Sequence, residues 1–304
     1  MQKVSVVIPC HNAERWIGAT LESVFAQTWR NLEVIVVDDG STDRSPTVVE
    51  GLARNNLTLI RQEKRGAAAA RNVGLASAAG DFVQLLDADD LIDPDKIALQ
   101  MARLDGHSRS IASARWARFR DRPEDARFVD EPVGRDLDPI DWLALSRAEG
   151  LGMMFPALWL MPMAIVRSVG PWREDLSLAD DTEYFTRVVL AADRILFERD
   201  ARAKLYHALV ARRIAGFNPP TSGGYRVLLT VLVGRVVGFH LRGQVRSADE
   251  EVTAQLVRKV QIACPVGSYG CILHADAANH RIDARAERPG KSGEQGERGE
   301  LPSR

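Results

Sequence analysis

Short runs of β-branched residues alternate with helical patterns through the first hundred residues of this 304-residue chain, and this alternation most constrains its fold. The strand-like runs are KVSVVIP at 3–9, LEVIVVDD at 32–39, LTLI at 57–60 and DFVQLL at 81–86. Helical patterns separate them at 13–27, from Ser45-Pro46 onward, at 66–80 and from Asp93-Pro94 onward. The alternation predicts an α/β fold with a parallel sheet, and the near-continuous Val, Ile and Leu strands predict helices on both faces.

The rest of the chain carries weaker patterns. Residues 107–150 are rich in Arg, Asp and Pro, and apolar density returns at 153–172, before an amphipathic helical pattern at 180–193. The apolar run at 227–241 is interrupted by a charge and is shorter than the ~18 residues that span a membrane. It predicts a packed helix in preference to a helix on a membrane surface. After residue 263 the sequence becomes polar and glycine-rich, which predicts disorder.

Net charge and cysteine content exclude some classes of protein. The chain has 40 basic and 41 acidic residues, so its overall charge gives no attraction for nucleic acid. The three cysteines, Cys10, Cys264 and Cys271, form no C-x-x-C pair. That pattern is typical of a reducing cytoplasm and argues against a disulfide framework or a thiolate zinc site. The N-terminal apolar run ends at Pro9 and is too short for the core of a signal peptide.

Five carboxylates follow the fourth predicted strand directly: Asp87, Asp89, Asp90, Asp93 and Asp95. Residues i and i+2 of a strand point the same way, so Asp87 and Asp89 are expected to converge. Ligands of open α/β sheets bind outside the carboxyl ends of the strands, and two hard oxygens suit Mg²⁺ or Mn²⁺. The alternative is that these acids form a turn and a helix cap, which we prefer for Asp93 and Asp95.

Three further polar groups each have a binding interpretation and a structural one. Asp38 and Asp39 end the second predicted strand, where a carboxylate accepts the N–H of a nucleotide base or forms an Asx-turn before the next helix. Arg71 offers a fork of donors that matches diphosphate oxygens, or is a surface arginine. Asp180 and Asp181 open a predicted helix, where acids also interact favourably with the helix dipole.

The order of these motifs is more specific than any one of them. VSVVIPCHNAERWIGATLESVFAQT, LEVIVVDDGSTDRS and GAAAARNVGLASAAGDFVQLLDADDLIDPD follow one another, and VGPWREDLSLADDTEYFTRV adds an acidic pair and an aromatic helix. This series closely resembles the family 2 glycosyltransferases over about residues 3–215. The resemblance implies the GT-A fold, a Rossmann-like α/β/α sandwich with a mostly parallel central sheet. To this the pattern adds a helical C-terminal extension and a disordered tail.

The resemblance also implies how the chain is organised. Residues 1–105 are expected to form the nucleotide-sugar-binding half of one GT-A domain, and residues 106–218 the acceptor-binding half. The helical extension is expected at 219–262 and the disordered tail at 263–304. An enzyme that works in the cytoplasm is expected, and contact of 223–242 with the inner face of the membrane is a hypothesis that follows from a lipid-linked acceptor.

Individual residues take roles from the same resemblance. The residues expected to bind the nucleotide sugar are Pro9, Asn12, Asp38, Asp39, Arg71 and Asp87. Among these, Asp39 matches the aspartate that binds the base, and Arg71 matches the arginine near the diphosphate. Asp89 is expected to hold Mn²⁺ or Mg²⁺, Asp87 to bind ribose or share the metal, and Asp90 is a third candidate ligand. Asp181 matches the catalytic base.

The sequence departs from the family pattern at several positions. His11 stands where tyrosine is usual, Lys64 where asparagine is common, and Asp180 where glutamate is frequent. Pro171-Trp172 replaces Gly-Phe. These differences leave the nucleotide and metal roles intact and concern the acceptor pocket.

The implied reaction is inverting transfer of a sugar from a nucleoside diphosphate sugar, expected to be UDP-linked, to an acceptor hydroxyl. At the ordinary pKa of ~3.9 the carboxyl of Asp181 would be ionised at pH 7 and would take the proton as the hydroxyl attacks. The acceptor is expected to be a sugar or a lipid-linked molecule in the assembly of cell-surface polysaccharide or glycolipid.

Two other functions remain alternatives. The chain could be a catalytically inactive partner protein that binds nucleotide sugars, although the presence of Asp39, Arg71, Asp89 and Asp181 argues against this. A nucleotidyltransferase should carry a glycine-rich basic loop after the first strand, and a nicotinamide-dependent enzyme should carry G-x-G-x-x-G there. The sequence PCHNAE at that position has neither motif.

Overall fold

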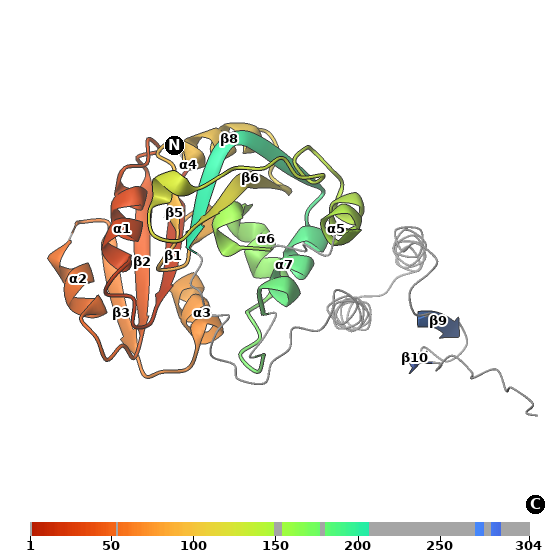
Figure 1. Ribbon diagram of the computed structural model, residues 1–304, viewed down its shortest axis with the longest axis horizontal. Coiled ribbons are helices and arrows are strands. Elements are labelled where there is room, and N and C mark those ends of the chain that lie inside the picture. The colour runs from red at the N-terminus through yellow and green to blue at the C-terminus, as the bar shows by residue number, and fades with distance from the viewer. Residues whose placement is uncertain are drawn as a thin grey trace, which may run out of the picture. The chain divides into compact units, whose positions relative to one another are not determined.

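The computed structural model of the protein describes residues 2–52, 54–148, 154–176, 180–206, 271–276 and 281–286. The chain divides into two units, Met1–Gln261 and Ile262–Arg304. In the first unit, helices lie against both faces of an eight-stranded sheet (Figure 1). The predicted α/β sandwich is therefore confirmed.

The eight strands of the first unit form one mixed sheet in the order β3-β2-β1-β4-β7-β6-β8-β5. Their bounds are β1 Val4–Cys10, β2 Leu32–Asp39, β3 Leu57–Gln62, β4 Phe82–Leu85, β5 Leu91–Ile92, β6 Ser110–Phe119, β7 Leu160–Pro162 and β8 Arg194–Tyr206. Strands β1 to β4 are parallel, as are β6 and β8, whereas β5 is antiparallel to β8. Because β7 is antiparallel to both β4 and β6, strands β6 and β8 end at the same edge as β1, β2 and β4.

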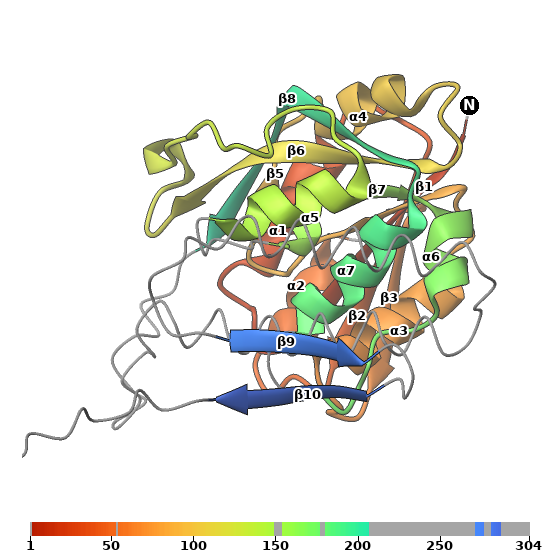
Figure 2. The same cartoon turned by 90° about the vertical axis from the view of Figure 1, so that its right-hand side faces the viewer.

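Seven α-helices cover this sheet within the described residues. They are α1 Ile17–Phe25, α2 Ser45–Gly51, α3 Ala67–Ser77, α4 Lys96–Leu104, α5 Pro139–Ala148, α6 Met163–Val169 and α7 Asp180–Ala191, with 3₁₀ turns η1 Pro123–Asp125 and η2 Pro156–Leu158. Figure 1 shows α1 and α2 on one side of β1 to β3 and α3 on the other. Figure 2 shows α4 on one side of β6 and β8, and α5, α6 and α7 on the opposite side.

Helix α3 packs closely on β1 and β2 because its inner face is made of small residues. Ala68–Ala70 and Gly74 are buried, and a Cβ atom at Gly74 would lie 2.3 Å from Cγ1 of Val7. Gly66, at the start of the helix, has φ 98°, a conformation that favours glycine. The close packing fixes the position of Arg71 on α3, at the edge where β1, β2 and β4 end.

A buried polar network joins the two parts of the sheet. The amine of Lys96, with no exposed surface, donates to Oε1 of Gln84 at 2.6 Å and to Oε1 of Gln100 at 2.7 Å. The two glutamine amides donate in turn to carbonyls of η2 and of Ala112. Burial lowers the pKa of Lys96 well below its ordinary value, because no carboxylate offsets the loss of water.

Two predicted helix starts are displaced by one or two residues. Ser45, which the Ser-Pro pattern predicts as an N-cap, is the first residue of α2, and its hydroxyl accepts the N–H of Ala13 at 2.8 Å, which ties the loop after β1 to this helix. Asp95, not Asp93, stands at the N-cap of α4, and it makes no side-chain capping bond. Asp93 instead forms an ion pair with Lys204 at 2.9 Å.

The sequence analysis did not predict β6, β8 or α5. A register shift in the β6–β8 pairing falls between Ala114 and Arg115, so the two-residue alternation that signals a strand breaks in the middle of β6. Strand β8 carries charged residues along much of its length, which obscures its strand pattern.

The second unit contains an antiparallel pair of strands, β9 Cys271–Asp276 and β10 Arg281–Ala286. These twelve residues differ from the disorder predicted for 263–304; the alternating sequence RIDARA has a strand period that the composition alone does not reveal. The predicted helical extension at 219–262, with its membrane-contact segment 223–242, lies outside the described residues. Within the described ranges, no helix has the length and apolar character needed to cross a membrane.

Candidate active site

The ends of β1, β2 and β4 bring several predicted site residues to one edge of the sheet. Asp38 pairs in register with Cys10 at the end of β1, and Pro9 is buried one residue earlier. Asp87 follows β4 by two residues. Because β1 is parallel to both β2 and β4, the three strands end at the same edge of the sheet.

The Asp39 carboxylate organises the loop between β3 and α3. Its Oδ1 accepts bonds from the amide of Gln62 and the backbone N–H of Arg65, both at 2.7 Å, and Oδ2 accepts the N–H of Gly66 at 2.8 Å. Burial alone would raise the pKa of Asp39, but these three bonds outweigh it and lower the pKa. Three of the four acceptor positions on this carboxylate are thus occupied within the protein.

The neighbouring carboxylate, Asp38, is less fully bonded. Asp38 is 5% exposed, and its Oδ1 has no hydrogen-bond partner among the described residues. Asn12, with φ 50°, donates its N–H to Oγ of Ser41 at 3.0 Å, and its side-chain oxygen accepts the N–H of Thr42 at 2.8 Å. Asn12 therefore joins the loops after β1 and β2, and Asp38 holds a free buried acceptor at this edge, as does Oε1 of Gln62 at the end of β3 among the described residues.

Arg71 is the centre of the acid cluster. Its guanidinium, 5% exposed, lies 2.8 Å from Asp87, 3.3 Å from Asp180 and 3.6 Å from Asp181. Burial alone would lower the pKa of Arg71, but Asp87 and the acid pair of α7 raise it. The alternative that Arg71 is a surface arginine is excluded, since the side chain is buried among carboxylates that come from two distant parts of the chain.

An aromatic residue that the sequence analysis did not assign to the site completes the surroundings of Arg71. The ring of Trp172 lies 4.4 Å beneath the guanidinium and stacks on Tyr184 of α7 at 4.1 Å and 11°. A cation over an indole face is attracted by about 0.5–2 kcal/mol. Trp172 was noted only as a departure from the family pattern, and its role depends on a contact that no local pattern reveals.

Asn72, beside Arg71 on α3, anchors the loop that carries Trp172. Its side-chain oxygen accepts the N–H of Trp172 at 2.8 Å, and its amide donates to the carbonyl of Trp172 at 3.0 Å and to Glu174 at 3.0 Å. Arg65 pairs with the same Glu174 at 2.8 Å. The loop before α7 is thus fixed to α3, which places the acid pair opposite Asp87.

Asp89 and Asp90 carry raised pKa values. Burial and the nearby Asp87 raise the pKa of Asp89 to about 6. Burial, then Asp87 and Asp89, raise the pKa of Asp90 well above its ordinary value, even though its Oδ1 accepts the N–H of Tyr206 at 3.0 Å. Asp89 and Asp90 are thus crowded with Asp87, and among the described residues neither has an ion pair with Arg71, which pairs with Asp87, Asp180 and Asp181.

A divalent metal fits this set of side chains only with help from a substrate. Among the described residues, no group of three or more His, Cys, Asp or Glu side chains converges to hold a metal. Mg²⁺ is usually held by one or two carboxylates together with substrate phosphates. Asp89 and Asp87, which repel each other and offer hard oxygens, fit that arrangement.

Asp181 differs from the ordinary aspartate that the sequence analysis assumed. Burial, with Asp87 and Asp180, raises its pKa to about 7, although Arg71 acts in the opposite direction. The expectation of full ionisation at pH 7 is therefore wrong for the chain alone. Its Oδ1 has no hydrogen-bond partner in the part of the chain that the structure describes, and is a buried oxygen able to accept a proton.

His11 and Lys64, two departures from the family pattern, meet at the nucleotide side of the edge. Nε2 of His11 lies 2.9 Å from Nζ of Lys64. His11 is also among the groups that lower the pKa of Asp39. The two substitutions therefore act together, beside the carboxylates that end β2.

Several known bacterial proteins are similar to this chain in sequence. A sequence model described as "Glycosyl transferase family 2" matches residues 5–166, which is more than half of the chain. "Glycosyltransferase GlyA" of Streptococcus pneumoniae serotype 4 is 33% identical over 119 residues, which cover 38% of this chain and 17% of GlyA. Across eight curated bacterial relatives, the matched region spans 17% to 44% of the relative's length.

Two solved structures share the fold at low sequence identity. S. aureus TarS 1-349 in complex with UDP-GlcNAc has a TM-score of 0.65 at 22% identity, covering 84% of this chain and 72% of that one. The mannosyltransferase PcManGT from Pyrobaculum calidifontis, in complex with GDP-Man and Mn2+, has a TM-score of 0.56 at 21% identity, covering 86% and 73%.

Proposed function

This chain belongs to glycosyl transferase family 2, and on that premise we propose that it transfers a sugar, with inversion, from a nucleoside diphosphate sugar to an acceptor hydroxyl. One observation carries the proposal: Asp87, from the end of β4, and the acid pair Asp180 and Asp181 meet at the single buried guanidinium of Arg71. Asp87, on the donor side, and Asp181, the candidate base, thus both lie beside the guanidinium of Arg71. The complex of TarS with UDP-GlcNAc supports a UDP-linked donor.

The base of the nucleotide would lie at the ends of β1 and β2. Pro9 near the end of β1 and Asn12 in the loop after it lie on one side of this place, and Asp38 and Asp39 at the end of β2 lie on the other. Asp38 has an unbonded buried oxygen, so we assign the acceptor of the base N–H to Asp38 as well as to Asp39. Asp39 in addition holds the loop that leads to α3, since three protein groups already donate to it.

Asp89 would be the principal metal ligand, with Asp87 and Asp90 as further candidates. A bound Mn²⁺ or Mg²⁺ would supply positive charge beside the diphosphate as negative charge develops there. The Mn²⁺ complex of PcManGT supports this assignment. Arg71 is held by three carboxylates here, so we propose that it positions Asp87 and Asp181 and faces the diphosphate only after Asp87 engages the donor.

In the proposed reaction, the acceptor oxygen forms a bond to the anomeric carbon while the bond from that carbon to the diphosphate oxygen breaks. The electron pair leaves with the nucleoside diphosphate, and the hydroxyl proton passes to the carboxylate of Asp181. A pKa raised to about 7 makes Asp181 a stronger base than an ordinary aspartate. A single displacement from the opposite side inverts the anomeric centre.

The acceptor side is proposed from the family alone. We propose a sugar or a lipid-linked acceptor in cell-surface polysaccharide or glycolipid assembly, used at the cytoplasmic side of the membrane. Sedimentation of the full chain with anionic vesicles would test the membrane contact, and protein that stays in the supernatant would contradict it.

The test of the proposed function is release of nucleoside diphosphate from a panel of UDP- and GDP-sugars, with Mn²⁺ or with EDTA. One donor is expected to turn over in Mn²⁺ and to be inert in EDTA. A titration of Mn²⁺ with UDP, followed by electron paramagnetic resonance, should show weaker Mn²⁺ binding in Asp89→Asn. Binding of a sugar nucleotide without any release would favour the inactive partner protein, and no binding at all would refute both.

A further inference from the structure

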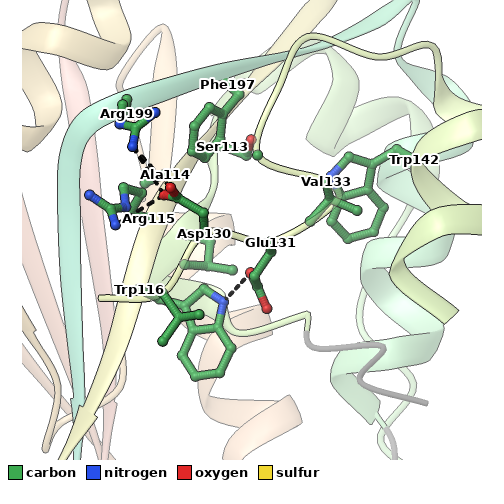
Figure 3. Close-up of a pocket in the computed structure, with 13 residues that line it drawn as sticks. Ser113, Ala114, Arg115, Trp116, Asp130, Glu131, Val133, Trp142, Phe197 and Arg199 are labelled. Carbon is green, nitrogen blue, oxygen red and sulfur yellow. Dashed lines mark hydrogen bonds and ion pairs between the residues drawn. The ribbon is translucent and has the colours of Figure 1, made fainter. Parts of the chain in front are cut away.

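A pocket outside the acid cluster lies between the β6–β8 ladder and residues 129–134 (Figure 3). Its volume is about 170 Å³. Ser113 and Trp116 of β6, Phe197 of β8 and Trp142 of α5 are among the residues that line it. None of the lining residues belongs to the acid cluster, so the function proposed above does not use this pocket.

Two buried polar groups on the pocket lining have no partner. Ser113 is 4% exposed and Trp142 is 2% exposed, and neither the hydroxyl of Ser113 nor the indole N–H of Trp142 has a hydrogen-bond partner among the described residues. Figure 3 shows the nitrogen-bearing edge of Trp142 on the side of Val133 and Ser113. A buried donor without a partner costs roughly 1–3 kcal/mol, so these two groups would gain from hydrogen bonds to a molecule in the pocket.

The charges around the pocket cancel. Asp130 lies 3.1 Å from Arg115 and 3.0 Å from Arg199, and Glu131 accepts the indole N–H of Trp116 at 2.7 Å. A phosphate would meet the two carboxylates and a metal ion would meet the two guanidinium groups, so a charged ligand gains little here. A purely apolar ligand would leave the buried donors unbonded.

The size and walls of the pocket suit a ring that is polar at its rim and apolar on its faces. An engineered cavity of about 150 Å³ in another protein holds a six-membered benzene ring. The side chains of Val133, Phe197 and Trp116 offer apolar walls, and the buried hydroxyl and indole offer hydrogen bonds. We propose that this pocket binds one sugar ring, whose hydroxyls bond Ser113 and Trp142 and whose C–H face packs on the aromatic walls.

Strand β6 connects this pocket with the proposed active site. Its last residue, Phe119, pairs with Tyr206, whose N–H donates to Asp90. Ser113 precedes Phe119 by six residues, which is about 20 Å along a strand. If the proposed function holds, an acceptor of several sugars could place one ring here while another presents its hydroxyl at Asp181. A separate saccharide that does not react is the other source of the same ring.

Binding is tested on the full chain with methyl glycosides of glucose, galactose, mannose and N-acetylglucosamine at millimolar concentration. Saturation-transfer NMR and tryptophan fluorescence should show binding of at least one of them. Ser113→Ala and Trp142→Phe should each weaken it about fivefold to tenfold, as loss of one hydrogen bond predicts. Ser110→Ala is the matched control, because Ser110 is buried on the same strand without lining the pocket, and it should not change binding.

If Ser113→Ala or Trp142→Phe fails to fold, a third variant, Val129→Trp, still tests whether the pocket binds a sugar. Val129 lines the pocket and is 70% exposed, so Val129→Trp should obstruct the pocket and abolish binding without loss of stability. Absence of binding by all four glycosides, or equal binding by wild type and Val129→Trp, would overturn the proposal. Either result leaves UDP binding untouched, so it is distinguishable from failure of the proposed function.

The two sources of the ring are separated by kinetics. Oligosaccharides of the glycoside that binds are used as acceptors, with the donor found in the panel. A rise in KM for the acceptor in Trp142→Phe, with kcat and donor KM unchanged, assigns the pocket to the acceptor. Weaker glycoside binding with unchanged KM assigns it to a separate saccharide and overturns the acceptor assignment.

Discussion

The two parts of the sheet hold polar groups in opposite ways. At the edge of the first part, β3-β2-β1-β4, Asp87 after β4 and the acid pair that opens α7 crowd around one buried arginine, and the pKa values of Asp89 and Asp181 are raised. In the second part, β7-β6-β8-β5, the 170 Å³ pocket has balanced charges and unpartnered buried donors. The difference indicates that the first part is built for a charged ligand and the second for a neutral one.

Removing the proposed base should have the largest effect and would test the charged part directly. In Asp181→Asn the acceptor proton has no carboxylate to receive it, so transfer should fall by about 10²–10⁴. Binding of UDP, measured by calorimetry, should change little because Asp181 belongs to α7 and not to the donor edge. The matched control is Asp175→Asn, an exposed acid that pairs with Arg173. Normal turnover in Asp181→Asn would remove the base assignment.

The second largest effect is expected from Arg71. Arg71→Met leaves three carboxylates without their shared cation, and loss of one partner of a buried ion pair costs about 3–5 kcal/mol. We expect the lower end, near 3 kcal/mol, because those carboxylates keep some contact with water. Urea unfolding measures it, and saturating UDP with Mn²⁺ should restore part of the loss. A change below about 1 kcal/mol would show that Arg71 does not hold the cluster together.

A third prediction concerns the buried lysine that joins the two parts of the sheet. Lys96→Met leaves the side-chain oxygens of Gln84 and Gln100 without a donor, at about 1–3 kcal/mol for each oxygen. The folded pKa of Lys96 lies below its unfolded value of 10.5, so the unfolded chain binds the extra proton between those two values. Wild-type stability should therefore rise as the pH rises toward 10.5, and Lys96→Met should lose that slope.

Its control is Lys204, whose side chain is 27% exposed and which pairs with Asp93. Lys204→Met should cost under about 1 kcal/mol and should keep the slope, since an ion pair near the surface contributes little. Equal slopes in wild type and Lys96→Met would contradict the neutral form of Lys96.

The acid cluster should give the metal-free protein an unusual dependence on pH. The folded pKa values of Asp181, about 7, and Asp89, about 6, lie above the unfolded value of 3.8, so the folded state binds more protons in that window. Stability should therefore increase as the pH falls from 7 toward 4, and should be lost again as the pH rises through 7. Melting curves at pH 7.5 and pH 5.5 measure it, with Asp181→Asn as the variant that should show a smaller gain.

The parts of the site that sequence predicts are those with a local signature. Asp38, Asp87 and Asp89 follow buried strands, and Asp181 opens an amphipathic helix, so strand ends and helix starts locate them. The site residues that the sequence did not predict depend on contacts between residues that are far apart in the sequence. Asn72 and Trp172 are 100 residues apart and share two hydrogen bonds that neither local pattern shows.

The second part of the sheet was not predicted for the same reason. Strands β6 and β8 lack a continuous two-residue alternation in their sequences, because the register of their pairing shifts after Ala114. The pocket between them requires Trp142 of α5 and the segment at 129–134 to fold back over the strands. The role of Asp39 in holding the loop before α3 likewise depends on its pairing in the sheet, although the acid itself was predicted.

The smallest expected changes in unfolding free energy concern the loop that holds Trp172 beneath Arg71. They compare the hydrogen bonds of Asn72 with the more exposed ion pair of Glu174. Asn72→Ala removes the reciprocal bonds to the backbone of Trp172 and should cost about 1–3 kcal/mol, because it leaves polar groups of a part-buried segment without partners. Glu174→Ala removes the ion pair with Arg65, both of whose side chains are more than a third exposed, and should cost under about 1 kcal/mol. Urea unfolding of the two variants compares them on one scale. If Glu174→Ala proved the more costly, the loop would be held from the surface, and the fixed position of Trp172 under the guanidinium would need another explanation.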